Sequence, residues 1–212
     1  MKVFVDNDIA VKLAQWGLLH RFSQHLIKQG RAELHGVSTL RYKFKLDHPD
    51  KAAALLGSTK AANDLVGFLG LCKPVKLHDA AVAAALADVP NVDAGEAALF
   101  AAAARFDAVL VDTGDKKALR ALGALGNAHV AVAALAGKVA CLEQTMHYLV
   151  SRWTFQPVHD AVVGMPQADR ATHGCFKGNV ESVALGALQG KVDELKLHCC
   201  GILAEKPFSW IP

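Results

Sequence analysis

Several features that would assign the chain to a common class are absent from its sequence. No segment reaches the roughly 18 uninterrupted apolar residues that cross a bilayer, so we expect no membrane contact. The first residues, MKVFVDND, lack the apolar stretch of a secretory signal and run directly into acids. The five cysteines are an odd, scattered set, which argues against a disulfide framework and for a reducing compartment. We therefore expect a cytoplasmic protein.

The sequence also lacks the motifs of several enzyme classes. It contains no Gly-rich phosphate loop of the G-x-x-x-x-G-K-[ST] type and no G-x-S-x-G elbow. The residues that bind zinc elsewhere occur only as His173 with Cys175 and as His198 with Cys199 and Cys200. Neither spacing matches a two-pair zinc pattern. Buried cysteines with capping or surface histidines explain these positions better.

What the chain has in quantity is apolar, helix-favouring sequence. Of its 212 residues, 52% are hydrophobic and 20% are charged, which is enough to bury a core and too apolar for disorder. Its richness in alanine and leucine favours helices. The formal net charge of +3 permits contact with a phosphate backbone without indicating it.

Strand-like and helix-like patterns alternate along most of the chain. Short runs of β-branched and apolar residues predict strands at 2–5, 34–40, 107–112 and 129–132. Apolar intervals of three and four predict helices at 9–30, 41–47, 50–70, 79–88, 95–105, 116–125 and 136–151, with a break at Lys73-Pro74. This order predicts an α/β fold in which a parallel sheet carries helices on both faces.

The pattern changes after about Trp153. The following stretch holds several Gly, Pro and His residues without a sustained period, and one further helix is predicted at 180–197. We interpret residues 1–152 as the main domain and residues 153–212 as a C-terminal extension or subdomain packed on it. The terminal segment PFSWIP is a reasonable docking element.

Acidic residues occur where the predicted strands end. Asp6 and Asp8 follow the first strand, Asp112 and Asp115 follow the strand at 107–112, and Glu96 opens the intervening helix. The carboxyl ends of parallel strands converge on one crevice. Carboxylates pressed together there repel each other unless protons or cations neutralise them, and Mg²⁺ or Mn²⁺ prefer oxygen ligands. A pair of such ions can activate water for phosphodiester cleavage.

A structural role explains each of these acids taken singly. An Asp between a strand and a helix is commonly an N-cap, and Asp8, Asp93 and Asp112 can be caps or support. A solvated helix start likewise explains Lys116 as well as phosphate contact does. The metal hypothesis therefore depends on the joint placement of Asp6, Glu96 and Asp115.

Two segments resemble the PIN-domain family of metal-dependent nucleases. VFVDNDIAVKLA is similar to the family's first motif, in which a hydrophobic strand is followed by an Asp, a small polar residue and a helix. DAGEAALFAAAARFDAVLVDTGDKKALRAL resembles the second half of that domain, where an acid-bearing helix leads through a strand into T-x-D. The likeness covers roughly residues 1–150 and is absent from 153–212.

The resemblance implies a PIN-like ribonuclease that uses Mg²⁺ or Mn²⁺. Asp6, Glu96 and Asp115 would be its catalytic, metal-binding acids, and Thr113 would orient one of them. The auxiliary metal candidates are Asp8, Asp93 and Asp112. Many relatives are toxins of bacterial toxin–antitoxin pairs, so the expected partners are RNA or single-stranded nucleic acid, an inhibitory antitoxin and a second copy of the chain.

One segment departs from the family's pattern. The family usually places a Glu just after its second strand, whereas GVSTLRYKFKL has no acid between Gly36 and Lys45. Basic residues stand there instead, and the substrate-binding candidates are Arg41, Lys43, Thr113 and Lys116. The aromatic residues Tyr42 and Phe44 either stack on bases or pack in the core.

Three functional classes stay open at this point. The first is an active metal-dependent nuclease, with weaker metal binding or a substitute ligand from Asp8 or Asp93. The second is a degenerate PIN-like module that binds nucleic acid or assembles with other proteins. The third, a flavodoxin-like or receiver-type domain, also places acids after strands, but the T-G-D loop fits it less well.

Overall fold

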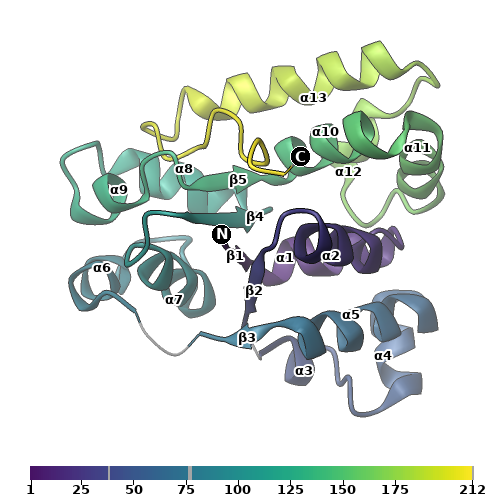
Figure 1. Ribbon diagram of the computed structural model, residues 1–212, viewed down its shortest axis with the longest axis horizontal. Coiled ribbons are helices and arrows are strands. Elements are labelled where there is room, and N and C mark those ends of the chain that lie inside the picture. Colours follow the sequence, from purple (N-terminus) through teal and green to yellow (C-terminus); the bar gives the residue numbers. More distant parts are fainter. Residues whose placement is uncertain (38, 76–77, 212) are drawn as a thin grey trace.

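A five-stranded, all-parallel sheet runs through the centre of the computed structural model, which describes residues 1–37, 39–75 and 78–211 (Figure 1). The strands are β1 (Lys2–Val5), β2 (Glu33–Gly36), β3 (Lys73–Pro74), β4 (Val109–Thr113) and β5 (Val139–Cys141). They lie in the order β3-β2-β1-β4-β5. The central strand β1 pairs with β2 on one side and β4 on the other, so Val3 lies opposite both Leu34 and Leu110.

Helices cover both faces of this sheet, as the alternating pattern predicts. They are α1 (Asn7–Gln15), α2 (Leu19–Lys28), α3 (Thr39–Lys43), α4 (Pro49–Leu56), α5 (Thr59–Leu71), α6 (Ala80–Leu86), α7 (Ala94–Ala103), α8 (Lys116–Ala124), α9 (Val130–Leu135), α10 (Leu142–Trp153), α11 (Phe155–Gly164), α12 (Arg170–Cys175) and α13 (Glu181–Lys196). Successive side chains of β1 point to opposite faces, so Val3 and Val5 join one core and Phe4 the other. The predicted α/β class with a parallel sheet is confirmed.

The predicted strand at 34–40 is too long. β2 ends at Gly36 because its partner β1 has four residues and the pairing stops at Val5 opposite Gly36. The chain then enters the short helix α3 at Thr39. The predicted break at Lys73-Pro74 is in fact the edge strand β3, where a proline is tolerated because one side of the strand has no partner.

The predicted strand at 129–132 is wrong. His129 caps a helix there, since its Nδ1 accepts a hydrogen bond from the Ala131 amide at 3.3 Å. The following alanines favour α9 over a strand. The last strand is instead β5, inside the region predicted as a helix at 136–151, and α10 begins only at Leu142. The helix predicted at 50–70 is divided by Gly57, whose φ of 85° ends α4.

The C-terminal residues are held against the edge strand β5 and against α10. The amide of Val139 donates to the carbonyl of Ile202 at 3.0 Å, and the amide of Ala204 donates to the carbonyl of Val139 at 2.7 Å. The predicted helix at 180–197 is confirmed as α13, which runs beside α10 (Figure 1). Helices α11 and α12 were not predicted: Pro157 interrupts the first, although its buried Phe155, Val158 and Val162 recur at intervals of three and four, and the second has only six residues.

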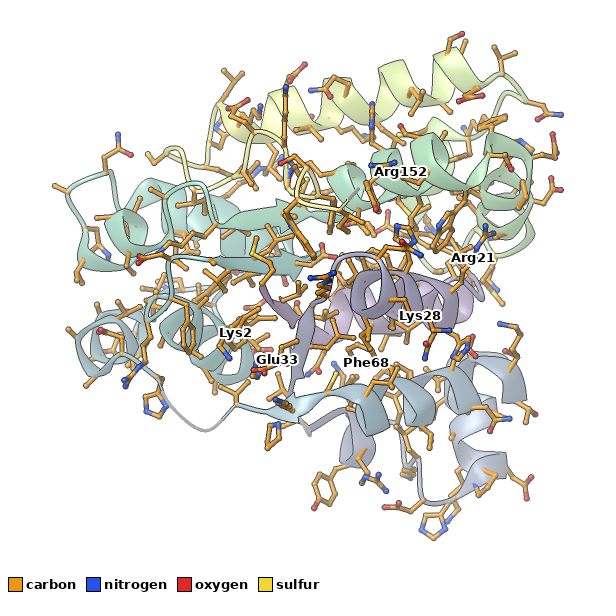
Figure 2. The ribbon with its side chains drawn as sticks, viewed as in Figure 1. Lys2, Arg21, Lys28, Glu33, Phe68 and Arg152 are labelled. Atoms are coloured by element: carbon orange, nitrogen blue, oxygen red, sulfur yellow. The ribbon has the colours of Figure 1, made fainter. Side chains whose placement is uncertain are left out.

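Two arginine side chains link α10 to neighbouring segments. The Arg21 guanidinium carbon of α2 lies 4.4 Å from the centroid of the Trp153 ring. Arg152 donates from Nη2 to the carbonyl of Ile211 at 2.9 Å, and both arginines are labelled in Figure 2. In the part of the chain that the structure describes, no helix combines the length and the apolar character needed to cross a bilayer.

Candidate metal and nucleic-acid site

The ends of the two central strands are joined by a short polar network. The Asp6 amide donates to the Asp112 carbonyl at 2.9 Å, which brings the residue after β1 beside the end of β4. The Thr113 hydroxyl donates to Asp6 Oδ2 at 3.0 Å and accepts from the Asp115 amide at 3.2 Å. Thr113 therefore fixes the orientation of Asp6 and the path of the loop that carries Asp115.

Glu96 reaches the same region from the start of α7. It forms a capping box with Asp93: the Glu96 amide donates to Asp93 Oδ1 at 2.8 Å, and the Asp93 amide donates to Glu96 Oε2 at 2.9 Å. This reciprocal pair satisfies two amides at the helix start and locks both acids in place. The other oxygen of each carboxylate, Asp93 Oδ2 and Glu96 Oε1, takes no part in the capping box.

Carboxylates from distant segments line one cavity of about 190 Å³ at the carboxyl end of the sheet. Its lining residues are Asp6, Asn7, Asp8, Val11, Lys43, Phe44, Asp93, Glu96 and Asp115. We call this cavity the acidic pocket. Five of its lining residues are thus acids, and all three acids of the metal hypothesis are among them.

Burial and mutual repulsion disfavour the charged forms of the two innermost acids. Asp6 and Glu96 are each only 5% exposed. Burial raises the pKa of Asp6 to about 6, and nearby Asp8 and Asp93 act in the same direction. Burial raises the pKa of Glu96 to about 8, with a further contribution from the charges of Asp6 and Asp115. A cation bound beside Asp6 and Glu96 would favour their charged forms and lower both pKa values.

Asp112, an auxiliary candidate, does not line the acidic pocket. Its side chain is fully buried, and Oδ1 accepts a hydrogen bond from the Thr145 hydroxyl at 2.7 Å. Burial raises the pKa of Asp112 to about 8, so the neutral acid is the favoured form at pH 7. Asp112 is therefore a buried structural group of β4.

Two observations bear on whether the acidic pocket fits a divalent ion. Asn7 Oδ1 is buried without a hydrogen-bond partner among the described residues, and Asn7 lines the pocket. A Cβ on Gly114 would lie 2.1 Å from Asp8 Oδ2, so the T-G-D loop packs directly on that carboxylate. The donors are carboxylate and amide oxygens, the set that Mg²⁺ and Mn²⁺ prefer.

The acids lie farther apart than the ligands of a bound ion. Within residues 1–37, 39–75 and 78–211, no three His, Cys, Asp or Glu side chains are grouped closely enough to hold a metal. Asp115 Oδ1 caps α8 by accepting from the amides of Lys117 at 2.7 Å and Ala118 at 3.1 Å. Ion binding would have to draw these carboxylates together. The donor chemistry fits the metal, and the spacing requires that adjustment.

The predicted basic residues separate into different roles. Lys43 lines the acidic pocket, whereas Arg41 pairs with Asp47, 2.6 Å from Nη1 to Oδ1. Lys116 forms an ion pair with Glu143, a fully buried residue in the first turn of α10. Lys116 is thus paired with a buried acid. Of the predicted basic residues, Lys43 is the one that lines the acidic pocket.

The two aromatic residues beside Lys43 also differ. Tyr42 is 78% exposed, so core packing is wrong for this residue. Phe44 is partly buried against one core and also lines the acidic pocket.

Two polar residues of this region were not among the predicted site residues. Asn7 could have been chosen from its place directly after Asp6. Glu143 could not, because its partner Lys116 lies on another helix.

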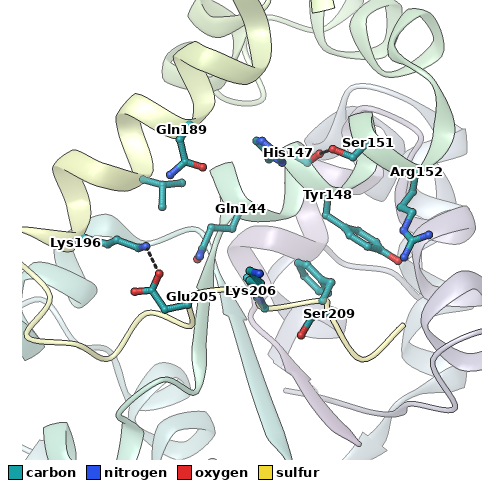
Figure 3. Close-up of a pocket in the computed structure, with 13 residues that line it drawn as sticks. Gln144, His147, Tyr148, Ser151, Arg152, Gln189, Lys196, Glu205, Lys206 and Ser209 are labelled. Atoms are coloured by element: carbon teal, nitrogen blue, oxygen red, sulfur yellow. Dashed lines mark hydrogen bonds and ion pairs between the residues drawn. The ribbon is translucent and has the colours of Figure 1, made fainter. Parts of the chain in front are cut away.

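A second cavity, of about 320 Å³, lies between α10, α13 and the C-terminal segment (Figure 3). Its polar lining includes Arg152, Lys206 and the ion pair of Lys196 Nζ with Glu205 Oε2 at 2.9 Å. It shares no lining residue with the acidic pocket. The two cavities are therefore separate.

Comparison with known proteins gives no match among the family models, the curated proteins or the solved structures. The inference of function therefore rests on the fold and on the residues of the acidic pocket.

Proposed function

We propose that the chain is a PIN-like, Mg²⁺- or Mn²⁺-dependent nuclease that cleaves phosphodiester bonds in RNA. The main support is that Asp6, Glu96 and Asp115 come from three distant segments and line one pocket at the carboxyl end of a parallel sheet. The strand order β3-β2-β1-β4-β5 is compatible with a PIN-like fold. The choice of a PIN-like nuclease is supported by the resemblance of two sequence segments to the PIN-domain family.

In this proposal the acids hold the metal and the neighbouring polar groups hold the acids. Asp6, Glu96 and Asp115 are the ligands, with Asp8 and Asp93 as auxiliary carboxylates from the same pocket. A bound divalent ion supplies Lewis acidity and an activated water. Thr113 keeps Asp6 Oδ2 in place, and the Asn7 amide oxygen offers a neutral donor.

Lys43 and Tyr42 of α3 are the proposed substrate contacts. A lysine at the pocket attracts a phosphate, and its charge compensates in part for the carboxylates around it. An exposed tyrosine beside it offers a ring on which an unpaired base can stack. The expected macromolecular partners are RNA or another single-stranded nucleic acid, an inhibitory antitoxin-like protein, and a second copy of the chain.

A second candidate function is a PIN-like module without catalysis that binds nucleic acid or assembles with proteins. Two observations favour it. Lys43 lines the pocket in the segment where the resemblance would place an acid, and the described carboxylates are not grouped closely enough to hold an ion without adjustment. Such a module would still bind RNA through α3 and would not cleave it.

Cleavage assays separate the two candidates. The purified chain is incubated with mixed RNA and single-stranded DNA, with Mn²⁺ or with EDTA, beside an Asp6→Asn/Asp115→Asn double variant. The nuclease proposal expects cleavage that needs Mn²⁺ and is lost in the variant. Binding of RNA without cleavage in any divalent ion would favour the second candidate. Cleavage that survives EDTA and both substitutions would contradict the metal mechanism.

A further inference from the structure

The C-terminal part of the chain contacts the edge strand β5, and it also contacts α1. The segment 165–169, between α11 and α12, lies along one face of α1. The Trp16 indole donates from Nε1 to the Met165 carbonyl at 3.1 Å, and Lys12 Nζ lies 2.9 Å from Asp169 Oδ2. Lys12 and Trp16 are one helical turn apart, so both contacts use the same face of α1.

Lys12 also binds a carboxylate of the acidic pocket. Its Nζ lies 2.6 Å from Asp8 Oδ2, so one ammonium is shared between Asp8 and Asp169. The side chains of Lys12 and Asp169 are each only 14% exposed. Burial alone would lower the pKa of Lys12, but the two carboxylates outweigh it and hold the pKa above its usual value. Lys12 is therefore charged, and Asp169 offsets part of its charge.

Asp8 transmits this contact to the loop that carries Asp115. The carboxylate of Asp8 packs on Gly114, where a Cβ would lie 2.1 Å from Asp8 Oδ2 and 3.3 Å from Lys12 Nζ. Asp169, Lys12, Asp8 and Gly114 thus form a continuous chain of contacts. It links α12, outside the region that resembles the nuclease family, to the wall of the acidic pocket.

We infer that Asp169 is a positioning residue through which the C-terminal segment sets the cation affinity of the acidic pocket. The inference depends on the proposed metal site. While Asp169 shares Lys12, Asp8 keeps part of its negative charge for a cation in the pocket. Without the Asp169 charge, the whole ammonium acts on Asp8 and on the pocket beside it. Both changes oppose binding of a divalent ion.

The variant Asp169→Asn tests this role with little disturbance of the fold. Asp169 Oδ1 caps α12 by accepting from the Thr172 amide at 2.7 Å, and asparagine caps a helix as well as aspartate does. The matched control is Asp160→Asn, which makes the same change on an exposed residue of α11. Thermal unfolding followed by circular dichroism confirms that each full-length variant is folded.

Mn²⁺ binding is measured by calorimetry at low ionic strength. We expect Asp169→Asn to weaken binding by about fivefold or more, a modest coupling between two sites, and Asp160→Asn to leave it unchanged. In a Lys12→Gln background the Asp169→Asn change should have less than about a twofold effect, since the shared ammonium is gone.

The possible failures are distinguishable. Equal Mn²⁺ affinity of the wild type and Asp169→Asn overturns the positioning role and leaves the nuclease proposal intact. An undiminished effect of Asp169→Asn in the Lys12→Gln background also overturns it, because the effect then does not pass through Lys12. Absence of saturable Mn²⁺ binding in the wild type overturns the metal site and this inference together.

Discussion

The hydroxyl of Thr113 donates a 3.0 Å hydrogen bond to the carboxylate of Asp6, and both residues are buried. This contact joins the ends of β1 and β4 and gives the acidic pocket a fixed wall. Burial raises the pKa of Asp6 to about 6, and this hydrogen bond, together with the one from the Asn7 amide, limits the rise.

Removing this hydroxyl should impair both stability and metal binding. Thr113→Val leaves Asp6 Oδ2 without its donor, and we expect a loss of about 1–2 kcal/mol in the free energy of unfolding. Mn²⁺ affinity should fall as well, because Asp6 is no longer oriented. Urea unfolding and calorimetry measure the two effects.

The matched control for Thr113 is Thr145→Val, which removes the buried bond to Asp112. It should reduce stability by a similar amount and leave Mn²⁺ affinity unchanged. Equal loss of metal binding in both variants would mean that Thr113 acts only through general stability.

The raised pKa of Glu96 predicts how stability varies with pH in the absence of metal. Its folded value of about 8 lies above the ordinary 4.5, so the folded state retains a proton that the unfolded state releases. This contribution to stability is present at low pH and is lost as pH rises from about 4.5 to 8. Urea unfolding at pH 5, 6.5 and 8 should show the decline, and saturating Mn²⁺ should reduce it.

Glu96→Gln should reduce this pH dependence, since glutamine does not ionise and fits the capping box. The control is Glu181→Gln, an exposed residue in the first turn of α13. A decline that is the same in Glu96→Gln as in the wild type would show that other groups cause it.

Asp112 should be dispensable for metal binding. Asp112→Asn replaces a buried acid that favours the neutral form with a neutral side chain of similar shape. We expect Mn²⁺ affinity within about twofold of the wild type, a difference below roughly 0.5 kcal/mol. Calorimetry that shows loss of binding in Asp112→Asn alone would return this residue to the set of ligands.

Lys43 should contribute a phosphate contact to RNA binding. Lys43→Gln should weaken binding of a single-stranded oligonucleotide in EDTA and reduce the slope of log affinity against log salt by about 0.7, the loss of one contact. Fluorescence anisotropy across a salt series measures both. Lys51→Gln, on an exposed position of α4, is the control. An unchanged slope in Lys43→Gln would exclude the contact.

Much of the fold could be predicted from the sequence. The central strands β1 and β4 each contain three consecutive apolar residues, VFV and VLV, a signal that burial on both faces of a parallel sheet produces. The edge strands gave little signal because β3 has two residues and β5 has three. Their strand character depends on pairing with β2 and β4, which no local pattern encodes.

The candidate site could also be predicted in part, because the central strands could be located from the sequence. The acids that follow central strands lie together because the sheet brings strand ends together, so Asp6 and Asp115 could be chosen from their positions. Asp112, predicted as an auxiliary ligand candidate, does not line the acidic pocket, because successive side chains along a strand point in opposite directions. The Lys12–Asp169 contact joins segments far apart in sequence and has no local signal.

The central claim is that Asp6, Glu96 and Asp115 together bind a divalent cation. Calorimetric titration of the full chain with Mn²⁺ tests it most directly, beside Asp6→Asn, Glu96→Gln, Asp115→Asn and the control Asp112→Asn. We expect saturable binding in the wild type and the control, and at least about tenfold weaker binding, roughly 1.4 kcal/mol, in each of the other three. Absence of saturable binding in the wild type, or equal affinity in all five proteins, would contradict it.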